Sequence, residues 1–325
     1  MSEVFILSKK EIENFLKMSE ALKAVEKAFR LQGQGEPVMP PKLYLELPKY
    51  HGDFRAMPAY IDGSAGIKWV SVYPNNPGHN LPTVLAVIIL CDLNTGYPLA
   101  VMDGTYITNM RTGAAGGVAV KYLARTESSV IGIIGAGMQA RTQLMAIKEV
   151  LSMIDEVKVF DQQEQASLKY AEEMGAKLNL DIRPVGSIEQ AADADILITT
   201  TPSRKPIVKK EYVRPGTHIN AIGADAKGKQ ELEADLLRAA KILVDDIEQA
   251  SHSGEINVPL SQGLTSLEDI YGNLSEVVAG IKKGRENEQE ITIFDSTGLG
   301  IHDIICARLV YERAKEEKAF AMELL

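Results

Sequence analysis

The sequence predicts an α/β protein of two domains, a doubly wound parallel sheet and a strand-rich α+β domain. Its 325 residues are enough for two hydrophobic cores. Residues 42–104 read as successive strands with no helix between them. From about residue 128, strands alternate with helices, which is the pattern of a parallel sheet covered on both faces.

The first part of the chain is expected to begin with helix and continue as strands. Residues 2–33 show apolar residues at helical spacing, as in "MSEALKAVEKAFRLQ". A Gly/Ala-rich helix is expected over residues 105–124, with small residues that allow close packing. Between these helices lie five expected strands, which should be antiparallel neighbours: "KLYLEL", "FRAMPAYI", "GIKWVSV", "TVLAVIILCDL" and "YPLAVMDG".

The second part has the βαβ rhythm of a Rossmann domain. Helices are expected from Met138 and over "QASLKYAEEMGA", the latter ended by its glycine. The final helix, residues 300–320, is amphipathic and should pack back onto the first domain, so we expect domains at 1–125 with 303–325 and at 126–302. The expected strands are "SSVIGIIG", "EVKVFD", "ADILITTT", "THINAIG", "KILVDD" and "ITIFDS".

Composition narrows the class of protein. The chain is 45% hydrophobic and 24% charged, as in ordinary globular proteins, and no apolar run is long enough to cross a bilayer. A net charge of −9 without a basic patch argues against nucleic acid and anionic membranes. Cys91 and Cys306 lack the spaced partners of a metal site. We therefore expect reduced thiols, no metal and a cytoplasmic location.

The stretch "VIGIIGAGMQA" predicts a dinucleotide site. Gly135 permits a tight turn after a strand, and Gly137 lets backbone N–H groups approach a pyrophosphate at the start of the next helix. A glycine kept only for tight packing is the alternative. Asp161 ends the following strand, where an acid binds the adenine ribose and repels a 2′-phosphate. The next residue is Gln162, and the segment "DQQEQ" contains no arginine that could bind a 2′-phosphate. NAD is therefore favoured over NADP.

Other strand ends supply further candidates, because the cofactor of such a sheet lies along the carboxyl ends of its strands. Each could equally be an ordinary polar turn. With the first helical residues after the turn, the candidates are Met138, Gln139, Thr200, Thr201, Pro202, Ile222, Gly223, Ala224, Asp225, Ser296, Thr297 and Gly298.

Three cations of the first domain are candidates for binding a small carboxylate. Arg55, Lys68 and Arg111 each lie in an apolar segment, and a buried cation without a partner is costly. Singly, each is better explained without a ligand, as a strand lysine that reaches solvent or an arginine paired with a nearby carboxylate. Together they would bind a carboxylate, and burial beside arginines would lower the pKa of Lys68 toward neutrality, as acid–base catalysis needs.

Six motifs in order resemble the ornithine cyclodeaminase/μ-crystallin family over nearly the whole chain: "FRAMPAY", "GIKWVSVYPNNP", "MRTGAAGG", "IGAGMQA", "THINAIGAD" and "IFDSTG". The resemblance is greatest to the archaeal alanine dehydrogenases of that family. It implies that the first domain binds substrate and joins two subunits in a homodimer. It also implies that Arg55, Lys68 and Arg111 hold the substrate, that Arg111 and Thr112 reach the cofactor, and that Lys68 and Asp225 are catalytic.

The family divides by chemistry, and Arg55 bears on the division. In the cyclodeaminases, a glutamate at this position would hold the distal ammonium of ornithine, whereas a cation here favours a short apolar side chain. We therefore expect an NAD-dependent L-alanine dehydrogenase acting on alanine, pyruvate and ammonia. A cyclodeaminase, a ketimine reductase and a non-enzymatic crystallin-type binding protein are the alternatives. The physiological direction and the tolerance for larger 2-oxo acids stay open.

Overall fold

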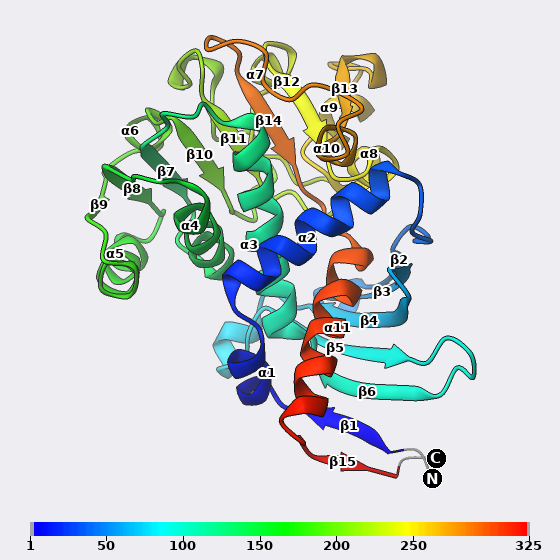
Figure 1. Ribbon diagram of the computed structural model, residues 1–325. Coiled ribbons are helices and arrows are strands. Elements are labelled where there is room, and N and C mark those ends of the chain that lie inside the picture. The colour runs from blue at the N-terminus through cyan, green and yellow to red at the C-terminus, as the bar shows by residue number, and fades with distance from the viewer. Residues whose placement is uncertain (1–2, 324–325) are drawn as a thin grey trace. The chain divides into compact units, whose positions relative to one another are not determined.

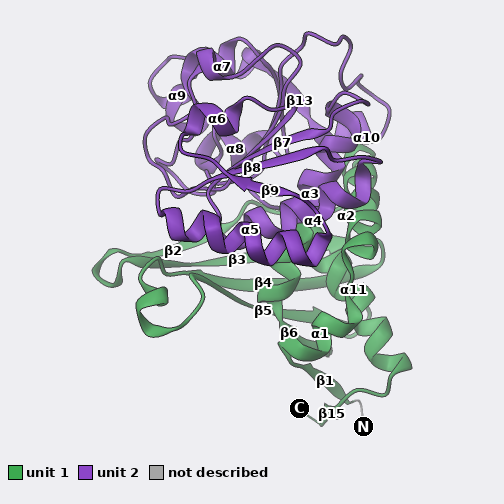
Figure 2. Ribbon diagram, turned by 90° about the vertical axis from the view of Figure 1, so that its left-hand side faces the viewer, with its two compact units in different colours: residues 1–111, 299–325 green, residues 112–298 purple. Residues whose placement is uncertain are grey.

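The structure is a computed structural model that describes residues 3–323 and contains two compact units. Unit 1 comprises Met1–Arg111 and Leu299–Leu325, and unit 2 comprises Thr112–Gly298 (Figure 2). The division falls inside α3 (Gly104–Leu123), earlier than the boundary expected after residue 125, because one continuous helix contributes to both units.

Unit 1 is built on a seven-stranded sheet with the order β15-β1-β6-β5-β4-β3-β2. Neighbours from β2 to β6 are antiparallel, as the lack of intervening helices predicts, and β1 pairs with β6 in parallel. The strands are β1 (Val4–Leu7), β2 (Leu43–Leu47), β3 (Gly52–Ile61), β4 (Ser64–Val72), β5 (Val84–Cys91), β6 (Pro98–Asp103) and β15 (Ala321–Met322).

Helices α1 (Lys9–Phe15), α2 (Met18–Gly33) and α11 (Gly300–Glu316) complete unit 1. The prediction of helix from residue 2 was wrong at its start, because β1 precedes α1 and pairs with β6. Helix α2 buries an apolar stripe at helical spacing, which includes Val25 and Phe29. Helix α11 packs against α2, β3 and β4 (Figure 1), so the last helix covers one face of this sheet.

The opposite face of the unit 1 sheet is apolar and solvent-exposed. Trp69 and Val87 lie side by side in the β4–β5 register, and each is more than 40% exposed. The Phe54 ring stacks on Trp69 with 5.3 Å between centroids. Leu43 and Leu45 extend the same face along the edge strand β2, because they pair with Ala56 and Phe54. This outer face, defined by Leu43, Leu45, Phe54, Trp69 and Val87, is large for a surface in contact with water.

Unit 2 is a doubly wound parallel sheet of order β13-β12-β14-β11-β10-β7-β8-β9, which confirms the predicted fold class. The winding reverses between β7 and β10, and ligands of such sheets bind at the carboxyl ends of the strands at this point. The strands are β7 (Val130–Ile134), β8 (Glu156–Phe160), β9 (Ile182–Pro184), β10 (Ile196–Thr199), β11 (His218–Ala221), β12 (Lys241–Val244), β13 (Ile270–Asn273) and β14 (Thr292–Asp295).

The helices of unit 2 follow its strands along the chain. Helix α5 passes through Gly175 and ends at Leu178, with Asn179 in the left-handed conformation, so the predicted glycine stop was wrong. The small residues of α3 do allow close packing: a Cβ on Gly113 would lie 2.4 Å from the carbonyl oxygen of Thr142. The helices are α4 (Met138–Val150), α5 (Glu164–Leu178), α6 (Ile188–Ala192), α7 (Ala234–Arg238), α8 (Ile247–Ser253), α9 (Asn257–Ser261) and α10 (Leu274–Val278).

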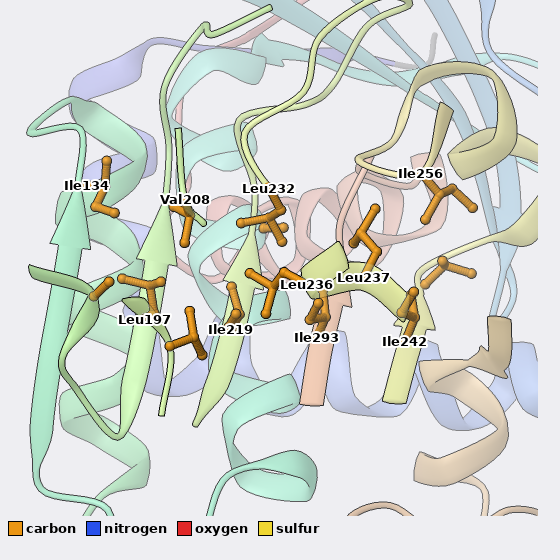
Figure 3. Close-up of a cluster of buried hydrophobic side chains, with 14 of the residues drawn as sticks. Ile134, Leu197, Val208, Ile219, Leu232, Leu236, Leu237, Ile242, Ile256 and Ile293 are labelled. Carbon is orange, nitrogen blue, oxygen red and sulfur yellow. The ribbon is translucent and has the colours of Figure 1, made fainter. Parts of the chain in front are cut away.

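Buried aliphatic side chains hold the loops of unit 2 onto the sheet. In Figure 3, Leu232 and Val208 lie beside Leu197 and Ile219 of the central strands, and all four belong to one buried cluster. No helix within residues 3–323 has the length and apolar character needed to cross a membrane.

Candidate functional site

Two of the predicted cations of unit 1, Arg55 and Lys68, lie on the inner face of its sheet, the face that α11 covers. In the strand register, Lys68 is opposite Met57 and Arg55 is opposite Val70. Since side chains alternate along a strand, Arg55 and Met57 share a face, and so do Lys68 and Val70. Arg55 and Lys68 are therefore diagonal neighbours on one face, and both are buried.

Lys68 and Arg111 share one carboxylate. The ammonium Nζ of Lys68 lies 2.7 Å from Oδ2 of Asp303, and Nε of Arg111 lies 2.9 Å from Oδ1 of the same side chain. Lys68 is 1% exposed and Asp303 is completely buried. Strand β4, helix α3 and helix α11 thus each contribute one charged group to a cluster that water does not reach.

The electrostatics of this cluster favour a lysine that exchanges protons near neutral pH. Burial, followed by the positive charge of Arg111, lowers the pKa of Lys68 to about 7, and the Asp303 carboxylate opposes that shift. The pKa of Asp303 is lower than usual because the two cations outweigh the effect of burial. Burial also lowers the pKa of the adjacent His302 to about 3 and raises that of the Cys306 thiol, so neither of these groups titrates near pH 7.

Arg55 lies in a second ion pair on the same face. Its Nε donates to Oδ1 of Asp53 at 2.6 Å, and one Nη donates to Oδ2 of the same carboxylate at 3.2 Å. The guanidinium also lies over the ring of Tyr44 on the neighbouring strand, 5.2 Å from its centroid. The expected alternative of pairing with a nearby carboxylate is therefore observed for Arg55, as it is for Arg111.

Asp303 and Asp53 are the residues of this cluster that the sequence interpretation missed. Asp303 lies on α11 between apolar residues, including Ile301 and Ile304, which are fully buried. An acid in the buried part of a helix needs a cationic partner. That signal was readable in "GIHDIIC", because the same interpretation placed three cations and this helix in one domain.

In unit 2, the glycine turn has the shape that a dinucleotide needs. Gly135 adopts a φ of +94°, and its N–H donates to the carbonyl of Phe160 at 2.8 Å. A Cβ on Gly137 would meet nothing within 4 Å, so there is open space beside this residue. Helix α4 starts immediately afterwards, and its N-cap residue Gly137 has no side chain that could cap it. The open space and the glycine at the N-cap fit a pyrophosphate.

Asp161 is held beside this turn. Its Oδ2 accepts from the backbone N–H of Ala136 at 2.8 Å, and its Oδ1 accepts from the N–H of Gln163 at 2.9 Å. The side chain of Gln162 is exposed. The geometry therefore places the predicted acid at the turn, where an adenine ribose would lie.

Hydrogen bonds hold Thr200, Thr297 and Gly298 at the predicted strand ends of unit 2. The hydroxyl of Thr200 donates to the carbonyl of Gly135 at 2.8 Å, which joins the end of β10 to the glycine turn. Asp245 accepts from the hydroxyl of Thr297 at 2.9 Å and from the N–H of Gly298 at 2.6 Å. The remaining predicted residues of these ends are Thr201, Pro202, Ile222, Gly223, Ala224 and Ser296.

Two further predicted residues of unit 2 have definite partners. Asp225 forms an ion pair with Lys229, with 2.5 Å between Oδ1 and Nζ. The carbonyl of Thr112 accepts from the side-chain amide of Gln143 at 2.9 Å. Across residues 3–323, His, Cys, Asp and Glu side chains do not gather into groups suited to a metal ion.

Comparison with known proteins identifies the family. The chain matches the ornithine cyclodeaminase/mu-crystallin family over residues 2–318. It is 55% identical to an alanine dehydrogenase of Archaeoglobus fulgidus over 315 residues, covering 96% of this chain and 95% of that one. The chain belongs to the ornithine cyclodeaminase/mu-crystallin family, as the six motifs predicted.

Two solved structures have the same fold over nearly their whole length. One is an archaeal alanine dehydrogenase dimer with bound NAD, which is 52% identical and superposes with a TM-score of 0.96, covering 99% of this chain and all of that one. The other is the Δ1-pyrroline-2-carboxylate reductase of Thermococcus litoralis in complex with NADH and L-proline, which is 43% identical with a TM-score of 0.95 and the same coverage.

Proposed function

We propose that this protein is an NAD-dependent L-alanine dehydrogenase. The reaction is L-alanine + NAD⁺ + H₂O ⇌ pyruvate + NH₄⁺ + NADH + H⁺. That the chain is an NAD-dependent oxidoreductase is supported by the glycine turn with Asp161 and by the relatives solved with NAD or NADH. The narrower assignment to alanine rests on the charges of unit 1 and on the similarity to two alanine dehydrogenases.

The observation that carries the assignment is the balance of charge on the inner face of the unit 1 sheet. Three cations, Arg55, Lys68 and Arg111, face two carboxylates, Asp53 and Asp303. When Lys68 is protonated, these five groups carry an excess of one positive charge, which suits a 2-oxo acid with a single carboxylate. A diamino acid would add a second ammonium to a face that already carries this excess, at a cost in free energy.

The bound cofactor would accept the hydride from Cα of alanine and return it in the reverse direction. Residues Gly135, Gly137, Met138 and Gln139 would hold its pyrophosphate, and Asp161 its adenine ribose. Arg111 and Thr112 on α3 are proposed to approach it as well, as in the family.

Unit 1 would bind and orient the amino acid. Arg55 and Arg111 hold the substrate carboxylate by charged hydrogen bonds, which aligns Cα–H for transfer. Lys68, neutral in about half of the molecules near pH 7, accepts a proton from the substrate ammonium. The amine lone pair can then form the C=N bond as the hydride leaves.

Hydrolysis of the resulting imine needs a second set of proton transfers. Water adds to the imine carbon and releases one proton to solvent, which leaves a carbinolamine. Lys68 gives its proton to the nitrogen, the C–N bond breaks as ammonia leaves, and the neutral Lys68 takes up the proton of the carbinol hydroxyl as the C=O bond forms. Asp225, which forms an ion pair with Lys229, is proposed to orient the water.

The protein is proposed to act as a homodimer. The exposed outer face of Leu43, Leu45, Phe54, Trp69 and Val87 is an apolar surface at a sheet edge, which a second copy of the chain would cover. The similar archaeal enzyme was solved as a dimer.

A substrate screen tests the proposed activity. NADH absorbance is followed with alanine, with pyruvate plus ammonium, with ornithine and with Δ1-pyrroline-2-carboxylate. We expect the highest kcat/KM with the alanine–pyruvate pair. Proline formed from ornithine without net NADH would instead identify a cyclodeaminase, and faster reduction of the cyclic imine would identify a reductase like that of Thermococcus litoralis. NADH binding with no turnover of any of these would leave a binding protein.

A further inference from the structure

Glu231 is a fully buried carboxylate that accepts four hydrogen bonds. Its Oε2 accepts from the hydroxyl of Thr199 at 2.8 Å and from the N–H of Gly223 at 2.9 Å. Its Oε1 accepts from both the N–H and the hydroxyl of Thr201 at 2.7 Å. All four donors come from chain segments outside its own, so this one side chain connects separate parts of unit 2.

The four donors lie at the carboxyl ends of two adjacent strands of the sheet. Thr199 is the last residue of β10 and Thr201 follows it, whereas Gly223 comes shortly after β11. Thr200, between the two threonines, donates to the carbonyl of Gly135 in the glycine turn. Glu231 therefore fixes the loops that carry Thr200, Thr201, Pro202, Ile222, Gly223 and Ala224, the predicted cofactor contacts at these two strand ends.

The backbone of Glu231 is itself held by hydrogen bonds. Its carbonyl accepts from the N–H of Ile207 at 2.7 Å and of Val208 at 2.9 Å. The next side chain, Leu232, is buried in the cluster shown in Figure 3. Gly223 packs directly against the carboxylate of Glu231, since a Cβ added to Gly223 would lie only 2.4 Å from Oε2. The loop after β11 can thus approach the carboxylate only with glycine at this position.

A second buried carboxyl, Glu255, lies against the backbone of Glu231. Its Oε1 accepts from the N–H of Glu231 at 2.8 Å and from the N–H of Leu232 at 2.5 Å. Burial raises the pKa of both side chains. The four donors oppose this effect at Glu231, whereas the charge of Glu231 adds to it at Glu255. The pKa of Glu255 is therefore raised further than that of Glu231.

We infer that Glu231 is a positioning residue of the NAD site, whose carboxylate holds the loops after β10 and β11 in the form that receives the dinucleotide. The inference rests on the NAD binding of the proposed function and is independent of the substrate. It also extends to Asp225, which follows the anchored Gly223 by two positions and whose N–H donates to the Gly223 carbonyl at 3.1 Å.

The test compares Glu231→Gln with Glu255→Gln by equilibrium titration of NADH, followed by nucleotide fluorescence in the absence of substrate. An amide at position 231 presents N–H groups to two of the four donors, so we expect the Kd for NADH to rise by about ten- to a hundredfold. Glu255→Gln makes the same chemical change at a second buried carboxyl, whose described hydrogen bonds come from the N–H groups of Glu231 and Leu232 and not from the loops after β10 and β11. We expect its Kd to stay within about twofold of the parent.

A second pair of variants tests the inference if Glu231→Gln does not fold. Thr199 is fully buried and lies outside the predicted cofactor contacts, so an effect on NADH must pass through Glu231. Thr199→Val removes the hydroxyl and keeps the shape, and we expect the Kd to rise by about three- to tenfold. Thr199→Ser keeps the hydroxyl, and we expect it to bind NADH like the parent.

A lowered melting temperature with unchanged Kd in Glu231→Gln and Thr199→Val would make Glu231 purely structural and overturn the inference. Equal weakening by Glu231→Gln and Glu255→Gln would also overturn it, because the effect would then belong to the buried layer as a whole. Since no substrate enters these titrations, their outcome is independent of whether alanine is turned over, and a failed substrate screen leaves them unaffected.

Discussion

Replacing Asp303 with asparagine should move the pH dependence of alanine oxidation to lower pH. Lys68 must be neutral to accept a proton from the substrate, and its pKa is about 7 with Asp303 only 2.7 Å away. Asparagine keeps the shape but removes the negative charge that favours the protonated lysine. An opposite charge at this range shifts a pKa by about one to three units. The acidic limb of the kcat/KM profile should therefore move to lower pH by that amount.

The same change should destabilise the protein. Removing one partner of a buried ion pair typically costs about 3–5 kcal/mol, because a charge is left without its partner. Lys68 can relieve part of this cost by releasing its proton, whereas Arg111 cannot. The melting temperature should therefore fall, and at acidic pH the fall should be larger, since Lys68 is then forced to be charged.

The assay measures kcat/KM for alanine between about pH 5 and 10 in parent, Asp303→Asn and Asp53→Asn. The ammonium of the substrate titrates identically in all three and cancels in the comparison. Asp53→Asn instead removes the carboxylate that pairs with Arg55. The acidic limb of its kcat/KM profile should therefore lie at the same pH as that of the parent. A limb that does not move in folded Asp303→Asn, or that moves to higher pH, would show that Lys68 is not the titrating base.

Four further expectations follow from the site. Lys68→Ala should bind NADH as the parent does and lose about 10²- to 10⁴-fold in kcat, whereas a loss of only a few-fold would make Lys68 structural. Asp161→Ser combined with Gln162→Arg should narrow or reverse the preference for NADH over NADPH in steady-state kinetics; equal use of both by the parent would contradict the ribose assignment. Trp69→Glu should convert a dimer to a monomer in sedimentation at micromolar concentration, and a parent that already sediments as a monomer would refute the dimer. Arg55→Ala should raise the KM for pyruvate about ten- to a hundredfold with little change for NADH, since a charged hydrogen bond contributes about 1.5–3 kcal/mol; an unchanged KM beside a lower melting temperature would make Arg55 structural.

The fold was readable from the sequence where elements are long or strongly patterned. The strands β3 to β6 and the glycine turn follow from alternation and from G-x-G-x-x-A. The strands β9 and β13 were missed because each has only three or four residues and lies at an end of the sheet, where few contacts depend on its sequence. Strand β1 was missed because its four residues run directly into a helical pattern.

The site was predictable in its cations and less so in its anions. Arg55, Lys68 and Arg111 were conspicuous because each stands in an apolar segment. Asp303 is separated from Arg111 by 192 positions, so the apolar setting of "GIHDIIC" indicates a buried acid but not which cation it pairs with. Glu231 was harder still to predict, because a glutamate in a polar loop is normally expected to face solvent. Only the structure shows that groups at the strand ends donate hydrogen bonds to it.

The added carboxylates sharpen the argument for substrate. With three cations alone, the inner face of unit 1 would have suited a dicarboxylate as well as a monocarboxylate. Among these five groups, Asp303 balances one cation and Asp53 another, so one positive charge is left for the carboxylate of a 2-oxo acid when Lys68 is protonated. A second substrate carboxylate would then lack a partner in a buried place, and a second substrate ammonium would find both acids already occupied. When Lys68 is neutral, as the proposed proton acceptor must be, the two arginines and two aspartates cancel, and a zwitterionic amino acid with an uncharged side chain adds no net charge to them.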